Sequence, residues 1–144
     1  MYKRILIPTD GTSITSHAVE AALGLARLAS GELFAVAVKE PFPYSAISEM
    51  QPVPPQEFYD AQERIASSRV KAVVDAAKAA GIACSGHTVE ALHPWEAILD
   101  HAKTQQCDLI VMASHGRRGI SALLLGSETQ RVLIHSTLPV LVVR

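Results

Sequence analysis

The sequence is poor in aromatic residues and carries almost no net charge. It has only three Phe, three Tyr and one Trp among 144 residues, so Ala, Val, Leu and Ile must fill its core. A formal net charge of -1 gives no electrostatic reason to expect nucleic acid or an anionic membrane as a partner. No apolar run approaches the ~20 residues that span a bilayer. From these absences we expect a small water-exposed protein with an aliphatic core.

Cysteine and metal-binding patterns are also scarce. Cys84 and Cys107 lie in separate segments, without the CxxC spacing of redox or zinc sites. The six histidines form no HExxH motif and no i,i+4 pair, so we expect no metal held directly by protein side chains. The first residues run straight into a strand-like segment with no apolar signal segment behind them. We therefore expect a reduced, cytoplasmic protein.

Short apolar runs of strand length alternate with amphipathic helix patterns along the whole chain. The runs predict strands at 3–9, 33–38, 82–89, 108–113 and 140–143, the third of them polar enough for a sheet edge. Alternation of this kind implies right-handed crossovers and a mainly parallel sheet. We predict one α/β domain over residues 1–144. Its fold is an open, doubly wound, five-stranded sheet of order 3-2-1-4-5, Rossmann-like, with helices on both faces.

Several helix boundaries can be predicted from single residues. Gly31 is expected to end the first helix. Ser127 and Gln130 have capping-box spacing, which predicts that Ser127 caps the last helix. Segment 39–55 lacks periodicity and holds five of the eight prolines, so we expect a mobile or functional connection there. Charged residues of the helix that follows, such as Glu63 and Arg69, are interpreted as a solvated face.

The fold prediction places a crevice beside the most polar turns of the sequence. In an open sheet of this order, ligands bind beyond the carboxyl ends of the strands where the order reverses, between the first and fourth strands. The segments leaving those two strands are 8–12 and 113–119. Both are rich in Gly, Ser, Thr, Asp or Arg. The polar turns and the expected reversal of strand order therefore fall at the same place.

Residues of these two turns suit a phosphorylated ligand. Gly116 lets backbone amides approach an anion, and Arg117 can add charge-assisted contacts to phosphate oxygens. Gly126 and Ser127 precede a helix whose free amides favour a phosphate. Asp10 is an acceptor for a ribose hydroxyl, an adenine amino group or a metal-bound water. Each feature alone also suits an ordinary turn or helix start, but their joint placement predicts a site for a phosphorylated ligand such as a nucleotide.

Known catalytic motifs are missing from the sequence. There is no G-x-S-x-G nucleophile elbow, no G-x-x-x-x-G-K-[ST] loop and no residue that is plainly a base for water. We expect at most a slow ATPase, and more simply no enzyme.

Over essentially its whole length the chain resembles the universal stress protein family. The resemblance lies in Ile5-Leu6-Ile7-Pro8-Thr9-Asp10-Gly11-Thr12, in residues 108–119, in Leu124-Leu125-Gly126-Ser127 and in Pro139-Val140-Leu141-Val142-Val143. The nucleotide-binding branch of that family carries G-x2-G-x9-G-[ST]. Gly116, Gly126 and Ser127 match this motif, whereas Ala113 replaces its first glycine and adds a methyl group where the backbone approaches the nucleotide.

The resemblance implies ATP with Mg²⁺ as the ligand and a set of contact residues. Asp10 would face the adenosine, Val38 would pack on the adenine ring, and the glycines with Ser127 would hold the phosphates. The implied contact residues are Pro8, Thr9, Asp10, Val38, Met112, Ala113, His115, Gly116, Arg117, Gly126, Ser127 and Glu128.

The resemblance also implies a regulatory or stress-response homodimer that pairs through strand 139–143. That strand would otherwise be a bare hydrophobic sheet edge. Ala113 keeps a second hypothesis open, in which the protein is a nucleotide-free dimeric interaction module of the same fold. A third hypothesis is a slow ATP hydrolase or phosphotransferase. The sequence does not distinguish ATP from ADP, AMP or cyclic AMP, nor does it identify a protein partner.

Overall fold

A computed structural model describes residues 1–42, 56–115 and 125–144 of the chain. Five parallel strands form one sheet in the order β3-β2-β1-β4-β5. The strands are β1 (Arg4–Pro8), β2 (Glu32–Lys39), β3 (Cys84–Glu90), β4 (Leu109–Ala113) and β5 (Val140–Val143). The helices of the described residues are α1 (Ser13–Ala29), α3 (Gln56–Ala79), α4 (Pro94–Thr104) and α5 (Ser127–His135). The predicted doubly wound α/β fold and its strand order are confirmed.

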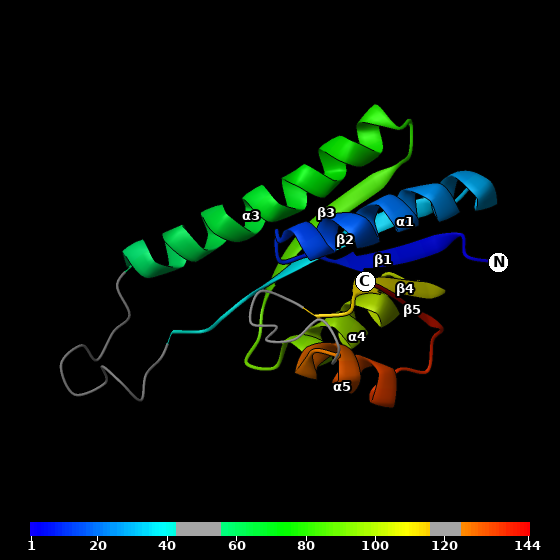
Figure 1. Ribbon diagram of the computed structural model, residues 1–144. Helices are drawn as coiled ribbons and strands as arrows, with labels where there is room; N and C mark the ends of the chain where they lie inside the picture. Colours follow the sequence, from blue (N-terminus) through cyan, green and yellow to red (C-terminus); the bar gives the residue numbers. More distant parts are fainter. Residues whose placement is uncertain (43–55, 116–124) are drawn as a thin grey trace.

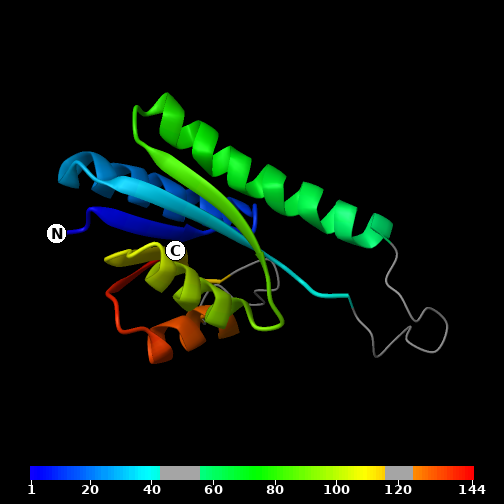
Figure 2. The ribbon, with the colours of Figure 1, turned by 180° about the vertical axis from the view of Figure 1, so that it is seen from behind.

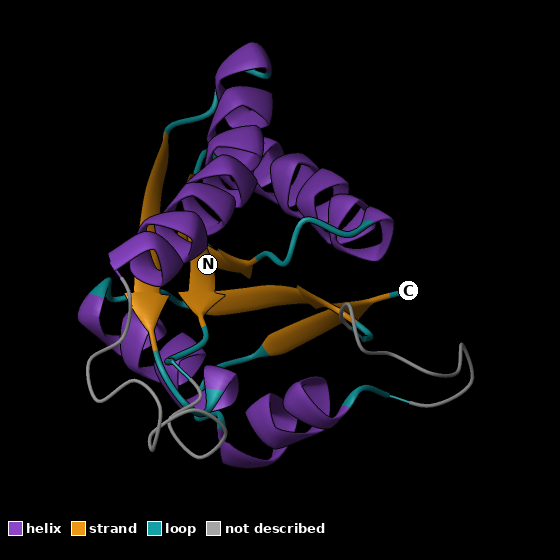
Figure 3. Cartoon of the chain, turned by 90° about the vertical axis from the view of Figure 1, so that its left-hand side faces the viewer, coloured by secondary structure: helices purple, strands orange, loops and turns teal. Residues whose placement is uncertain are grey.

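The helices cover the two faces of the sheet in pairs, α1 with α3 and α4 with α5 (Figures 1 and 2). Figure 3 shows the strands between these two helical layers. Each pair of helices packs on one face of the sheet and forms a separate apolar cluster with it. Val19 and Val73 pack on one face of the sheet, and Ile98 and Val132 pack on the other. None of the described helices is long and apolar enough to cross a bilayer.

Burial falls from the centre of the sheet to its edges. All five residues of β4 are buried, and Ile5, Leu6 and Ile7 of β1 are 0% exposed. Strand β3 has partly or fully exposed residues throughout, as its polar sequence predicted for an edge. Most of the predicted connection at 39–55 lies at 43–55, outside the described residues, so its expected mobility stays a prediction.

The two cysteines lie on opposite faces of the sheet. Cys84 packs against the cluster under α1 and α3, whereas Cys107 belongs to the cluster under α4 and α5. Burial raises the pKa of Cys107 to about 11, so it is a neutral thiol at ordinary pH. Both act as small apolar side chains rather than as a redox pair.

The end of α1 differs from the prediction. The residue with left-handed backbone is Ser30, at φ 51°, rather than Gly31. Gly31 is needed for a different reason, because a Cβ there would lie 2.9 Å from the carbonyl oxygens of both Tyr2 and Lys3. The glycine therefore allows the start of β2 to approach the start of β1.

The predicted capping box of α5 is wrong. Gly126 is the N-cap, and Ser127 is the first helical residue. The side chain of Gln130 donates to the carbonyl of Leu125 at 2.8 Å, instead of returning to the backbone of Ser127. Because Gly126 has no side-chain acceptor, the N-terminus of α5 lacks a side-chain cap.

One buried histidine links α4 to the edge strand. His101 of α4 is 8% exposed, and its ring centroid lies 4.9 Å from that of His87 on β3. Its Nε2 atom is buried and has no hydrogen-bond partner among the described residues. Burial, with a smaller contribution from the nearby His87, lowers the pKa of His101 below 6.5.

We predict that this histidine makes the fold less stable in acid. A histidine whose pKa is lower in the folded than in the unfolded state contributes stability above about pH 6.5, and that contribution is lost as the pH falls through the folded value. Urea unfolding at a series of pH values from neutral to mildly acidic should show a decline that His101→Leu reduces and His17→Gln, an exposed control, does not. An unchanged pH dependence in His101→Leu would contradict this role.

Candidate functional site

The sheet opens between β1 and β4 at the carboxyl ends of the strands. Their ladder pairs Ile5 with Leu109 and Leu6 with Ile110 and then ends. Each strand stays paired with its outer neighbour for longer. Pro8 pairs with Val36 of β2, and Ala113 pairs with Val143 of β5. The two strands therefore diverge at the reversal of strand order, which is where the sequence predicted a crevice.

Asp10 organises the turn that follows β1, on one side of this divergence. Its Oδ1 atom accepts hydrogen bonds from Thr12 N at 3.0 Å, Thr12 Oγ1 at 2.7 Å and Thr15 Oγ1 at 2.6 Å. Thr12 is the N-cap of α1 and accepts from Thr15 N at 3.3 Å. The carboxylate thus fixes the first turn of α1. The part played by Thr15 was not visible in the sequence.

The N-terminus of α5 is tied to the β4 side of the crevice. The buried hydroxyl of Thr129 donates to the carbonyl of Ala113 at 2.9 Å, and Gly126 N donates to Ser114 O at 2.8 Å. A Cβ at Gly126 would lie 3.0 Å from both Cα and Cβ of His115. A side chain at this position would therefore be tightly packed against His115, so the fit of the chain favours glycine here whether or not a phosphate lies beside it. Thr129 was missed because only its tertiary partner reveals its role.

The carboxylate of Glu128 is already engaged. Its Oε2 atom accepts from Trp95 N, in the first turn of α4, at 2.8 Å. The acidic side chain thus caps one helix, and its charge does not suit a phosphate. The contribution of Glu128 to an anion site would have to come from its backbone amide in the first turn of α5.

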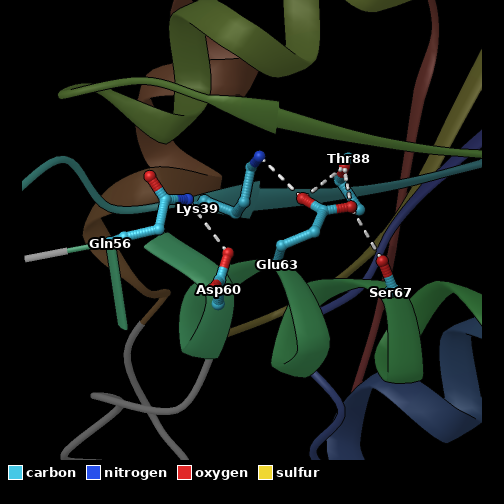
Figure 4. Close-up of polar contacts among 6 residues, drawn as sticks. All are labelled: Lys39, Gln56, Asp60, Glu63, Ser67 and Thr88. Carbon is cyan, nitrogen blue, oxygen red and sulfur yellow. Dashed lines mark hydrogen bonds and ion pairs between the residues drawn. The ribbon is translucent and has the colours of Figure 1, made fainter. Parts of the chain in front are cut away.

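Helix α3 brings two charged residues that the sequence analysis had assigned to a solvated face. The aliphatic part of Arg69 lies against Gly11, where an added Cβ would be 2.9 Å from Arg69 Cγ. Glu63 accepts from Lys39 of β2 at 2.7 Å and from Thr88 of β3 at 3.1 Å (Figure 4). The hydrogen bonds from Lys39, Ser67 and Thr88 lower the pKa of Glu63. Glu63 is exposed, as the solvated-face interpretation expected, but it also links α3 to the sheet through these bonds. Arg69 is half-buried against the turn, so the interpretation is incomplete for that residue.

The remaining expected contact residues occupy different surroundings. Thr9 is buried, and its amide donates to Val36 O at 2.9 Å, while its hydroxyl accepts from Gly11 N at 3.3 Å. Met112 is 6% exposed and offers little surface, whereas Val38 packs on the same cluster but is only partly buried.

Two further groups complete the expected set. The ring of His115 lies 3.1 Å, through Nδ1, from the hydroxyl of Ser114. Gly116 and Arg117 lie outside the described residues, and their expected roles stay predictions.

Comparison with known proteins identifies the family. The profile of the universal stress protein family matches residues 1–144. The chain belongs to the universal stress protein family. It is 30% identical over 153 aligned positions to universal stress protein MJ0531 of Methanocaldococcus jannaschii, covering 100% of this chain and 83% of that protein.

Solved structures agree with this universal stress protein fold. That of MJ0577, a universal stress protein of the same organism, superimposes with a TM-score of 0.84 at 27% identity, over 99% of this chain and 96% of that one. A universal stress protein solved in complex with cAMP superimposes with a TM-score of 0.73 at 27% identity, over 99% and 97% of the two chains.

We predict that Asp10 stabilises this universal stress protein without any ligand. Asp10→Ala removes the acceptor of three hydrogen bonds and should lower the free energy of unfolding by about 1–3 kcal/mol. Asp10→Asn keeps an oxygen at the same place and should cost clearly less. Urea denaturation in nucleotide-free buffer measures both changes. Equal stability of Asp10→Ala and the wild type would show that the turn does not depend on this carboxylate.

Proposed function

We propose that this universal stress protein binds an adenine nucleotide, ATP with Mg²⁺, in the crevice between β1 and β4. The observation that carries the proposal is the divergence of these strands beyond Leu6 and Ile110, with two helix N-termini on its two sides. Binding would serve regulation or the stress response rather than catalysis. Nucleotide occupancy would shift the protein between states that differ in their affinity for the nucleotide.

The chemistry of the two sides supports this ligand. The N-terminus of α5 lacks a side-chain cap, and Ser127, at its first position, is exposed. Free amides and the positive end of the helix dipole favour phosphate oxygens there. On the opposite side, Asp10 lies in a turn that its own hydrogen bonds hold in place. The polar groups of that turn suit the nucleoside part of the ligand.

The comparisons add independent support for an adenine nucleotide. The relative solved with cAMP shares 27% identity and the same fold over nearly its whole length. Its ligand combines adenine, ribose and phosphate, the three groups that the crevice is proposed to hold.

Magnesium would enter with the nucleotide rather than bind first. Among the residues that the structure describes, no group of three or more His, Cys, Asp or Glu side chains could hold a metal ion. Mg²⁺ keeps several waters and prefers phosphate oxygens with one or two carboxylates. The described residues therefore fit a cation that the phosphates bring with them.

We also propose that two copies pair through β5 in the cytoplasm. Strand β5 is the last of the sheet order, so one of its edges has no neighbour in the described chain. Leu141 is 39% exposed on it, and Ile134 on the preceding α5 is 73% exposed. Pairing two such strands across a two-fold axis would cover this apolar edge.

One observation favours the alternative of a nucleotide-free module. Gly126, the best-matched glycine of the motif, is explained by its contact with His115 without any ligand. Ala113, in place of the first glycine, is 8% exposed and its carbonyl is used by Thr129. A chain that had lost its affinity for nucleotides but kept these packing requirements would have the same residues at positions 113 and 126.

We predict that charge at Ser127 decides phosphate binding. Ser127→Asp adds a carboxylate where the phosphates would lie, yet it favours the N-terminus of α5 and should not unfold the protein. Calorimetric titration with Mg-ATP should show binding by the wild type, about tenfold or greater loss in Ser127→Asp, and near-normal affinity in Ser127→Asn, the neutral control of similar shape. Adenosine, which has no phosphate, should bind both variants equally.

The same titration separates the two functions. Absence of ATP binding in the wild type and its appearance in Ala113→Gly would favour the nucleotide-free module. Equal ATP affinity in Ser127→Asp and Ser127→Asn would place the phosphates elsewhere and contradict the proposed site.

A further inference from the structure

Strand β3 is an edge strand without the usual protection. It lies at the end of the sheet opposite β5 and has β2 as its one neighbour among the described residues. Its seven residues, Cys-Ser-Gly-His-Thr-Val-Glu, include no Pro and no Lys, and most are exposed. Proline, lysine, bulges and covering segments are the common ways in which proteins block an edge against further pairing. Among the residues that the structure describes, none therefore closes this edge to another strand.

The backbone of β3 has hydrogen-bonding groups available on its outer side. Ala83 O accepts from Leu33 N, and Ala91 N donates to Lys39 O, both toward β2. In a parallel ladder, alternate residues direct their N–H and C=O to the same neighbour. The intervening residues, with Gly86 and Thr88 at the middle of the strand, therefore point their backbone groups away from the sheet.

Two open depressions flank this edge, one on each face of the sheet. The first, of about 420 Å³, lies between β3 and α3 and has Val70 and Val74 in its lining. The second, of about 310 Å³, lies between β3 and α4. Figure 2 shows β3 between these two helices. Successive side chains of an added strand point to opposite faces, so they would enter the two depressions alternately.

The depression beside α4 is acidic. Glu96 and Asp100 of α4 are exposed acidic residues of its lining, which includes no Lys or Arg. No ion pair is recorded for these two carboxylates within the described part of the chain. Basic side chains would neutralise this charge. The depression beside α3 is lined by Val70, Val74 and Gly86 together with the polar residues Glu63, Ser67, Lys71, His87 and Thr88.

We propose that β3 accepts an extended segment of another protein as an added strand, in which Lys or Arg alternates with β-branched residues. Main-chain hydrogen bonds to the outer side of β3 supply the affinity, and the two depressions select the side chains. The basic residues face α4, and the β-branched residues face Val70 and Val74. A second copy of this chain fits less well, because its β3 carries His87 and Glu90 but no Lys or Arg.

This interaction is independent of the nucleotide proposal, since it uses the opposite side of β2 from the crevice. The probe is a short fluorescein-labelled peptide that alternates Lys with Val. Fluorescence anisotropy should show that it binds the wild type and that Asp100→Lys weakens binding about tenfold or more. Glu20→Lys is the matched control, because Glu20 is an exposed acidic residue in the interior of α1. The Glu20→Lys variant should bind the peptide with the same affinity as the wild type.

Hydrogen exchange followed by NMR distinguishes strand addition from plain charge attraction. The amides of Gly86 and Thr88 should exchange rapidly in the free protein and become protected when the peptide binds. Peptide binding without this protection would overturn the proposal, as would equal binding of a peptide with its lysines in one block. Protection of the same amides without peptide, in a protein that sediments as a dimer, would assign the edge to a second copy instead.

Discussion

The short ladder between β1 and β4 is the feature on which the proposed site depends. These central strands are buried on both faces, so their pairing at Ile5–Leu109 and Leu6–Ile110 joins the two halves of the sheet. Beyond that point β1 follows β2 and β4 follows β5. Twist accumulates between neighbouring strands of a sheet. Because the helices that follow β1 and β4 cover opposite faces, no crossover closes the space between them.

The two sides of this crevice are built differently. On the β1 side a single carboxylate, that of Asp10, holds the turn and the first residues of α1. On the β4 side, Thr129 and Gly126 fasten α5 to the end of the strand through backbone atoms. Both sets of contacts hold the backbone of the described chain, and both leave polar groups at the carboxyl ends of β1 and β4. A residue that matches a binding motif can therefore have a structural reason to be there, as Gly126 shows.

Much of the fold could be predicted from local sequence. The apolar run at Val140–Val143 and the polar run ending at Glu90 are both of strand length, and the polarity of the second suits its place at an edge. Alternation with helices then implies a parallel sheet, for which 3-2-1-4-5 is a common order. What could not be predicted depends on contacts distant in sequence. The left-handed conformation falls at Ser30, and Gly31 lies where a Cβ would approach the backbone of Tyr2 and Lys3.

The candidate site shows the same division. Its place in the fold followed from strand order and from two glycine-rich turns. The contacts of Thr129 with Ala113 and of Arg69 with Gly11 join separate elements, so no local sequence pattern predicts them. Whether the crevice binds a nucleotide is decided most directly by mapping amide chemical shifts of the isotope-labelled protein during titration with Mg-ATP. The account predicts shifts concentrated at residues 9–12 and 126–129. Shifts confined to other parts of the sheet, or none at millimolar ATP, would contradict it.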